Sequence, residues 1–200
     1  MADSNPIQTS IVNIRGTHGS GKSTLVKHIL DLYRTRGSVS ENTLQGRKRP
    51  FSYVCKSPEL RTLFVPGHYE TPGGGCDSIG EVAQAFDAVK TAADCGLSVL
   101  YEGILAQHSG GRLLELHRAH PVTVIALSTP LDLCIASVRS RRAERGASTD
   151  DFDPRNVEKE FRSVVSSSRT LGQRGMKIEH MSREDAYLAV VVWIETGGEA

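Results

Sequence analysis

The sequence predicts a single α/β domain, a three-layer sandwich in which helices cover both faces of a mainly parallel sheet. Short β-branched runs alternate with amphipathic helical stretches along the 200 residues, and 38% of the residues are hydrophobic, which is enough for a buried core. Parallel strands need crossover connections, so an alternating order of strands and helices favours a parallel sheet. Ligands of such sheets bind at the carboxyl ends of the strands.

The first strand and helix form the most regular pair in the chain. Ile11–Ile14 is a β-branched run that leads to Gly16, and apolar residues then recur at helical spacing over about 22–36. Gly37 is a suitable C-terminal cap for this helix. Residues 38–49 are polar, so we expect a loop there.

Further strands and helices follow in the same order. Two apolar runs, 51–56 and 60–65, flank Ser57-Pro58-Glu59, which indicates either a β-hairpin or a strand followed by an irregular excursion. The remaining elements are expected as strands at 97–101, 122–127 and 177–181, and as helices at 78–94, 112–120, 131–145, 154–171 and 182–194.

Composition and charge exclude several classes of protein. The 24 Lys and Arg residues balance 23 Asp and Glu residues, so the net charge of +1 excludes a polybasic protein that binds nucleic acid through bulk charge. The four cysteines contain no C-x-x-C pair, which points away from a zinc site or a small disulfide framework and towards a reducing cytoplasm. No apolar run approaches the roughly 20 residues of a membrane span, and residues 1–10 lack the order of a signal peptide. We therefore expect a cytoplasmic protein without membrane contact.

A phosphate-binding loop is expected between the first strand and the first helix. Residues 16–23 read Gly-Thr-His-Gly-Ser-Gly-Lys-Ser and match the pattern G-x-x-x-x-G-K-[ST] in a strand-to-helix setting. The glycines let successive backbone N–H groups face one anion, to which the helix N-terminus adds its positive end. Lys22 can then bridge the β- and γ-phosphates of ATP, and the Ser23 hydroxyl can bind Mg²⁺. The residues expected to bind the nucleotide are Gly16, Thr17, His18, Gly19, Ser20, Gly21, Lys22, Ser23 and Thr24.

Glu102 is expected on the metal side of the same site. It ends the apolar strand that begins near Leu97, and the P-loop NTPases, which the phosphate loop resembles, hold an acid near the metal at this position. The resemblance implies that Glu102 binds Mg²⁺ together with Ser23 or orients a water molecule. The alternative is an exposed acid at the end of a strand.

Four arginines lie within two helical turns of the segment 137–146. Arg139, Arg142 and Arg145 are spaced by three residues and share a helix face. Guanidinium groups bind phosphate at two points, and the segment resembles the arginine-bearing lid of nucleotide kinases, here about residues 136–155. The resemblance implies that Arg139 and Arg142 supply positive charge where the phosphoryl bond breaks, and that Arg142 also contacts the nucleotide. A solvated basic helix face is the alternative.

A loop with four glycines and two prolines, residues 66–77, is expected to bind the phosphoryl acceptor. Asp77 can accept the proton of the acceptor hydroxyl, or it can cap the helix that follows. His68 and Tyr69 can stack on a base or hydrogen-bond to it, or they can simply pack within the loop. Glu70 is a second carboxylate in the loop. The candidates for the general base are therefore Asp77, Glu102 and Glu70.

Together, residues 15–24, 67–77 and 101–103 and the arginine segment resemble the 5-hydroxymethyluracil (5-hmdU) DNA kinases of bacterial viruses, a group related to the thymidylate kinases. The resemblance implies one P-loop kinase domain over residues 1–200. It also implies ATP- and Mg²⁺-dependent transfer of the γ-phosphate to the 5-hydroxymethyl group of a modified pyrimidine in viral DNA, a step of thymidine hypermodification in the host cytoplasm. The Asp-Arg-[Tyr/Phe/His] motif of thymidylate kinase itself is absent after the third strand, where Glu102-Gly103 stands instead, and this disfavours free dTMP.

Two other classes of function remain open from the sequence. A kinase for free nucleoside monophosphates would use the same loop and lid, whereas a regulatory nucleotide-binding ATPase would need the loop alone. Because the chain carries almost no net charge, DNA binding requires a local basic surface, which Arg47-Lys48-Arg49 beside Phe51 can provide unless it is only a solvated loop. The oligomeric state is also left open.

Overall fold

A seven-stranded sheet forms the centre of the computed structural model, which describes residues 9–71, 74–103, 110–148 and 151–197. The strands lie in the order β2-β3-β4-β5-β1-β6-β7, and β3 is the one that runs against the others among these described strands. Their bounds are β1 (Ile11–Arg15), β2 (Ser38–Asn42), β3 (Ser52–Lys56), β4 (Leu63–Pro66), β5 (Ser98–Glu102), β6 (Val122–Leu127) and β7 (Lys177–Met181). The prediction of a mainly parallel sheet is confirmed.

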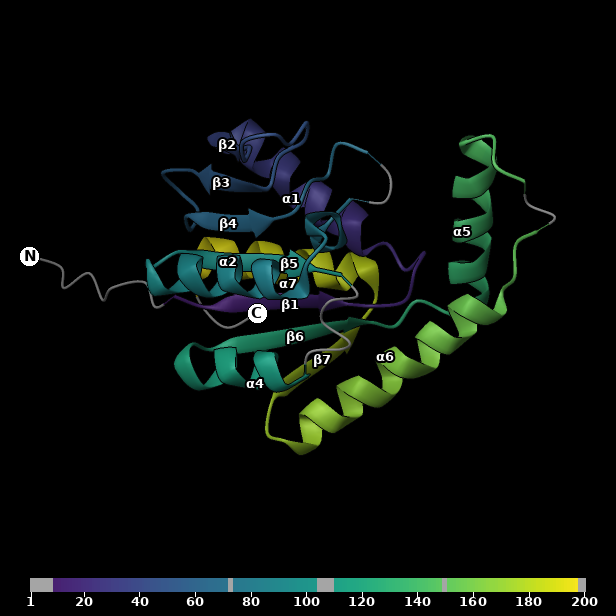
Figure 1. Ribbon diagram of the computed structural model, residues 1–200. Helices are drawn as coiled ribbons and strands as arrows, with labels where there is room; N and C mark the ends of the chain where they lie inside the picture. The colour runs from purple at the N-terminus through teal and green to yellow at the C-terminus, as the bar shows by residue number, and fades with distance from the viewer. Residues whose placement is uncertain (1–8, 72–73, 104–109, 149–150, 198–200) are drawn as a thin grey trace, which may run out of the picture.

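Helices cover both faces of this sheet (Figure 1). On one face, α1 (Lys22–Arg36) and α7 (Arg183–Thr196) bury apolar side chains against the strands. On the other face, α2 (Val82–Asp94), α4 (Gly110–Ala119) and α6 (Arg155–Gln173) do the same. Every residue of β1, β5 and β6 is buried, which explains why these strands are almost continuously apolar in sequence. The predicted three-layer sandwich is confirmed.

The chain forms a strand where the sequence predicts a loop. Ser38–Asn42 is the edge strand β2, paired antiparallel with β3 from Ser38 opposite Lys56 to Asn42 opposite Ser52. Its side chains are mostly exposed, so they are polar, and the backbone ladder alone marks it as a strand. The prediction of a loop over 38–49 is therefore wrong for β2. The neighbouring strands β3 and β4 pair antiparallel, which confirms the hairpin alternative for 51–65.

The helix expected over 78–94 consists of two elements. A 3₁₀ turn, η1 (Cys76–Ile79), comes first, and α2 begins only at Val82. Gly80 lies between them with a φ of +93°, a backbone conformation that a helix cannot continue through and that glycine adopts most readily. The two elements therefore meet at a bend, and Cys76 and Asp77 of η1 approach Gly103, which follows β5.

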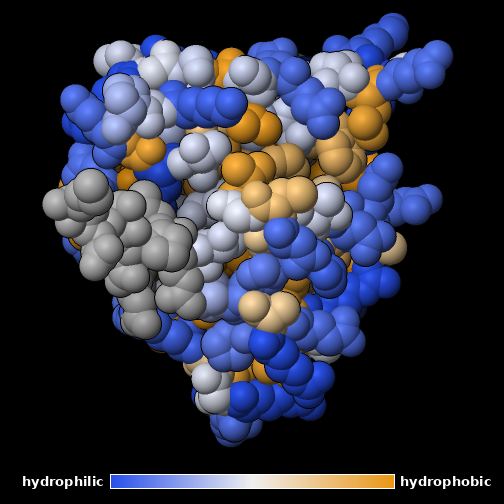
Figure 2. Space-filling model, turned by 90° about the vertical axis from the view of Figure 1, so that its left-hand side faces the viewer, coloured by the Kyte–Doolittle hydropathy of each residue, from blue (hydrophilic) through white to orange (hydrophobic). Residues whose placement is uncertain are grey.

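An arm formed by α5 (Leu131–Glu144) and α6 extends beyond the carboxyl ends of the central strands (Figure 1). The described part of the expected lid, residues 136–148 and 151–155, lies in this arm, and residues 149–150 lie outside the described residues. The end of the molecule turned away from the arm presents hydrophilic side chains around smaller hydrophobic areas, an ordinary mixture for a protein surface (Figure 2). Within the described residues, no helix combines the length and the apolar character that crossing a bilayer requires.

Candidate active site

The phosphate loop lies between β1 and the N-terminus of α1, as its sequence predicts. Gly19 and Gly21 have φ values of +86° and +93°, which favour glycine. Glycine is also required sterically, because a Cβ at Gly19 would lie 2.3 Å from the carbonyl oxygen of Cys134 in α5. Gly21 is the N-cap of α1, and no side chain caps it among the described residues. The first N–H groups of α1 are therefore open to an anion at the positive end of the helix dipole.

Lys22 lies inside the loop. Its side chain is only 8% exposed, and its ammonium group donates hydrogen bonds to the carbonyl oxygens of Gly16, at 2.7 Å, and Thr17, at 3.1 Å. These bonds hold the positive charge against the loop backbone. An incoming phosphate would therefore meet this charge and the helix N-terminus at one point.

Glu102 and Ser23 form the other wall of the site. Strand β5 pairs with β1 so that Glu102 lies beside Ile14, two residues before the loop begins. The Ser23 hydroxyl donates a 2.8 Å hydrogen bond to Oε1 of Glu102. Burial raises the pKa of this carboxyl, which is 2% exposed, although the charge of Lys22 and the bond from Ser23 oppose that rise.

The glycine-rich loop closes over the same carboxylate. Gly75 has a φ of +91°, and a Cβ there would lie 2.0 Å from Oε1 of Glu102. Asp77 follows in the first turn of η1, and a Cβ at Gly103 would lie 2.9 Å from its Oδ1. The N-caps are Gly75 for η1 and Glu81 for α2, so Asp77 does not cap the helix that follows it.

These groups enclose a cavity of about 220 Å³ at the carboxyl ends of β1 and β5, which we call the phosphate cavity. Its walls are His18, Gly19, Gly21, Lys22, Ser23, Thr24, Gly74, Asp77, Glu102, Ser137 and Arg141. The sequence brings most of them from the phosphate loop, and the fold adds Glu102 from β5, Asp77 from η1 and two residues of α5. Chemically, the cavity combines a cation, helix N–H groups and two carboxylates, which suits a phosphate ester with a bound metal ion.

Arg141 is the arginine of α5 that reaches the phosphate cavity. It is half-buried, and burial and then the neighbouring Arg145 lower the pKa of its guanidinium group. The sequence singled out Arg139 and Arg142 instead, and the structure places both over the ring of Phe152, at 5.4 and 6.0 Å from its centroid. The helical phase could have identified Arg141, because it lies seven residues after Cys134, the residue of α5 that contacts the loop at Gly19.

Comparisons with known proteins show the family of this chain. No family model matches the chain. The chain is 35% identical over 186 residues to a 5-hmdU DNA kinase of Pseudomonas phage PaMx11, an alignment that covers 92% of this chain and 97% of the relative. The chain belongs to the 5-hmdU DNA kinase family. The resemblance noted in the sequence is thereby confirmed, and the protein is a phosphotransferase.

Two more distant relatives of the kinase carry the same name. The 5-hmdU DNA kinase of Delftia phage PhiW-14 is 30% identical over 173 residues, and that of Bacillus phage SP10 is 22% identical over 174 residues. The alignments cover 78% and 83% of this chain, but only 62% and 26% of those relatives. The chain therefore spans less than two thirds of the length of each of these two relatives.

The kinase buries the two aromatic residues that the sequence proposed for base recognition. His68 is 4% exposed and Tyr69 is 7% exposed, and neither lines the phosphate cavity. Burial and then the charge of Arg49 lower the pKa of His68, whose Nε2 lies 3.4 Å from an Arg49 nitrogen. The backbone N–H of Tyr69 donates to the hydroxyl of Tyr53 at 3.2 Å. Both side chains therefore pack within the loop, the second alternative given by the sequence.

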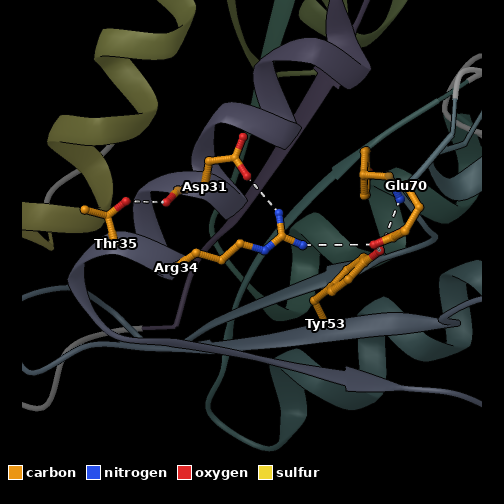
Figure 3. A network of polar contacts seen from close by, with 6 residues as sticks. Asp31, Arg34, Thr35, Tyr53 and Glu70 are labelled. Atoms are coloured by element: carbon orange, nitrogen blue, oxygen red, sulfur yellow. Dashed lines mark hydrogen bonds and ion pairs between the residues drawn. The ribbon is translucent and has the colours of Figure 1, made fainter.

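Glu70 belongs to a separate polar network that fastens the loop of the kinase to α1 and β3 (Figure 3). The Tyr53 hydroxyl donates a 2.6 Å hydrogen bond to Oε1 of Glu70, and a nitrogen of Arg34 lies 4.0 Å from the same oxygen. Arg34 also pairs with Asp31 at 2.8 Å. Burial and then the bond to Glu70 raise the pKa of Tyr53. Because Glu70 lies outside the phosphate cavity, the geometry gives it an anchoring role.

Glu160 of α6 is a site residue of the kinase that the sequence did not indicate. Its carboxylate accepts a 3.1 Å hydrogen bond from the backbone N–H of His18 and also contacts the His18 ring. Burial alone would raise the pKa of Glu160, but the contacts with His18 lower it below the ordinary value. His18 therefore connects the phosphate loop to the α5–α6 arm. No local sequence pattern around Glu160 predicts this contact, because the contact depends on how α6 crosses the phosphate loop.

Proposed function

We propose that this kinase transfers the γ-phosphate of ATP to the 5-hydroxymethyl group of 5-hydroxymethyl-deoxyuridine in phage DNA, a step of thymidine hypermodification. The observation that carries the proposal is the pairing of a complete phosphate loop around Lys22 with a buried acid, Glu102, bonded to the loop hydroxyl of Ser23. The name of the relative from phage PaMx11 supports the acceptor.

The donor is held by the loop in this proposal. The N–H groups at the start of α1 bind the phosphates, Lys22 bridges the β- and γ-phosphates, and Thr24 supports the α-phosphate. Mg²⁺ fits the residues present, because magnesium takes few protein ligands and prefers oxygen, and Ser23 and Glu102 offer a hydroxyl and a carboxylate side by side. When bound, the metal ion would neutralise charge on the transferring phosphate.

Asp77 is the general base that the geometry supports best. Its carboxylate lies in the wall of the phosphate cavity, whereas Glu102 is engaged by Ser23 and Glu70 lies in another network. In the transfer, the hydroxymethyl oxygen forms a bond to the γ-phosphorus, the bond from phosphorus to the β–γ bridging oxygen breaks, and ADP leaves. The proton of the hydroxymethyl group passes to the Asp77 carboxylate.

The α5–α6 arm acts as the lid of the single domain formed by residues 1–200. Arg141 faces the phosphate cavity and would supply positive charge to the transferring group. Arg139 and Arg142 would act through Phe152, and Arg142 also donates hydrogen bonds to the carbonyl oxygen of Ser148, at 2.9 and 3.2 Å. These bonds hold the residues that follow α5 against Arg142.

A labelling assay tests the acceptor. The kinase is supplied with γ-labelled ATP and with hydroxymethyluracil duplex, unmodified duplex or free deoxynucleoside monophosphates, and labelled products are separated. The proposal predicts label on the modified duplex alone. Label on a free monophosphate would support a nucleotide kinase instead, and release of phosphate whatever the acceptor would support a regulatory ATPase.

A further inference from the structure

A second cavity lies in the angle between α5 and α6, beside the phosphate cavity. Its volume is about 740 Å³, within the range of pockets that bind small molecules. His18 and Arg141 line both cavities, so the two are neighbours across these side chains. We call it the α5–α6 pocket. Besides His18 and Arg141, its walls include Val138, Phe152, Asn156, Val157 and Lys159.

The phosphate cavity cannot be reached by a base that stays paired in a duplex. Lys22 and Glu102, on its floor, are almost completely buried. The helix α5 lines the cavity at Ser137 and Arg141, and the glycine-rich loop lines it at Gly74 and Asp77. The C5 substituent of a paired pyrimidine lies in the major groove, which is about 12 Å wide and admits one helix. Because α5 and the glycine-rich loop cannot both enter that groove, the target nucleotide has to leave the helix.

The α5–α6 pocket has the chemistry of a site for an extruded pyrimidine. The Phe152 ring is partly exposed, and the guanidinium groups of Arg139 and Arg142 lie near it, which fixes its orientation. Val138 and Val157 add apolar surface. The two aromatic residues of the glycine-rich loop are buried, and the His18 ring on the pocket wall is engaged by Glu160, so Phe152 is the ring on this wall that is best placed to stack on a base.

The charges around the pocket complement a phosphodiester backbone. Arg145 and Lys159 lie on its wall and are exposed. Of the acidic residues there, Asp153 is paired with Arg155 at 2.8 Å and Glu160 with His18, which leaves Asp151. Two cations at the opening can therefore contact the phosphates that flank an extruded nucleotide.

We propose that the α5–α6 pocket receives the hydroxymethyl pyrimidine after it has turned out of the DNA duplex, with Phe152 as the surface on which the base stacks. The hydroxymethyl group then points past His18 and Arg141 into the phosphate cavity. This inference rests on the proposed function, because it assumes a hydroxymethyl pyrimidine in DNA as the acceptor.

Two duplexes test the extrusion step. They carry one hydroxymethyluracil opposite either adenine or an abasic site, and the dissociation constant of the wild-type kinase is measured for each by fluorescence anisotropy. An abasic partner removes the pairing energy that extrusion must overcome, so binding should tighten roughly tenfold. Equal affinities would overturn the proposal, because a base read within the duplex gains nothing from losing its partner.

Substitutions at Phe152 test the stacking surface. Phe152→Ala should raise the KM for DNA roughly tenfold and abolish the difference between the two duplexes, while the affinity for ATP stays the same. Phe152→Leu should behave like Ala, since it restores volume without a ring, and Phe152→Trp should retain binding. Leu133→Ala is the matched control, because Leu133 is an exposed apolar residue of α5 outside the pocket.

Failure of the pocket and failure of the proposed function give different results. If the wild type phosphorylates the modified duplex and Phe152→Ala does so with an unchanged KM, the pocket assignment is wrong and the function stands. If the wild type labels no modified duplex, the acceptor itself is wrong.

Discussion

The phosphate loop and the α5–α6 arm form two halves of one site and differ in how the chain builds them. The loop places most of the phosphate contacts within nine consecutive residues, 16–24, so that one turn and one helix N-terminus determine their geometry. The arm reaches the site from α5 and α6, through Arg141 and Glu160. The geometry of the loop side therefore depends on the local backbone, whereas that of the arm side depends on packing between distant segments.

The largest expected effect is on the loop side. Lys22→Ala should lower kcat by about 10²–10³-fold or more, because it removes the cation that faces the transferring phosphate. The rate is measured with γ-labelled ATP and modified duplex, and circular dichroism should show an intact fold. Lys27→Ala, an exposed lysine on the same helix, should keep the normal rate. Normal turnover by Lys22→Ala would remove the loop from the mechanism.

The contact between the glycine-rich loop and Glu102 gives the next effect. Gly75→Ala should lower kcat by about 10–100-fold, because the new Cβ would collide with Oε1 of Glu102, 2.0 Å away. Gly46→Ala is the control for backbone strain, since Gly46 has a φ of +82° but nothing within 4 Å of a Cβ. Gly46→Ala should lose about 1–2 kcal/mol of stability, measured by urea unfolding, and Gly75→Ala should lose more because of the added collision. Equal kcat values for the two variants would show that catalysis does not need the close approach of Gly75 to Glu102.

Arg141 and Arg139 both lie in the α5–α6 arm, but we expect them to differ in their effect on catalysis. Arg141→Ala should lower kcat by roughly 10–100-fold, whereas Arg139→Ala should cost less than that, because only Arg141 lines the phosphate cavity. Steady-state kinetics at saturating ATP would separate the two. If Arg139→Ala lowered kcat more than Arg141→Ala, the arm would have to close with a different face of α5 towards the phosphates.

The Glu102 carboxylate is expected to be needed for activity but to lower the stability of the fold near neutral pH. Its pKa is raised in the folded state, so the folded protein binds the proton more tightly than the unfolded chain does. Stability contributed by this group is present below the ordinary pKa of glutamate and is lost as pH rises through the raised pKa. Glu102→Gln should therefore raise the melting temperature near neutral pH by about 2–4 °C while lowering kcat by roughly tenfold, and weaken the fall of stability between weakly acidic and neutral pH. A lower melting temperature at neutral pH would contradict the sign.

The smallest effect is expected at Glu70. Glu70→Gln should weaken the bond from Tyr53 and the pairing with Arg34 and lower the free energy of unfolding by about 0.5–1 kcal/mol. It should change kcat by less than about threefold, since Glu70 lies outside the phosphate cavity. A fall in kcat of more than about tenfold would make Glu70 a candidate for the base again.

The same contrast explains what could be predicted from the sequence. The phosphate loop, Glu102 and the alternation of strands and helices are local patterns, and the sequence located each of them. Strand β2 escaped detection because an exposed edge strand needs no apolar residues, so only its pairing with β3 identifies it.

The α5–α6 arm contributes to the site through packing between distant residues, and no short stretch of sequence predicts such packing. Arg141 could have been found from its helical phase relative to Cys134. Glu160 could not be found in this way, because its contact with His18 depends on the position along α6 at which this helix crosses the phosphate loop. The burial of His68 and Tyr69 likewise follows from how the loop folds against β3 and η1.

The most direct test of the central claim is to locate the transferred phosphate. Modified duplex labelled by the kinase from γ-labelled ATP is digested to nucleoside 5′-monophosphates with a nuclease and a phosphodiesterase, without a phosphomonoesterase treatment, and the products are identified by mass spectrometry. The account predicts label on 5-hydroxymethyl-deoxyuridine as a phosphate ester of its hydroxymethyl group. Label at the 5′ ends of the strands, or as inorganic phosphate only, would contradict it.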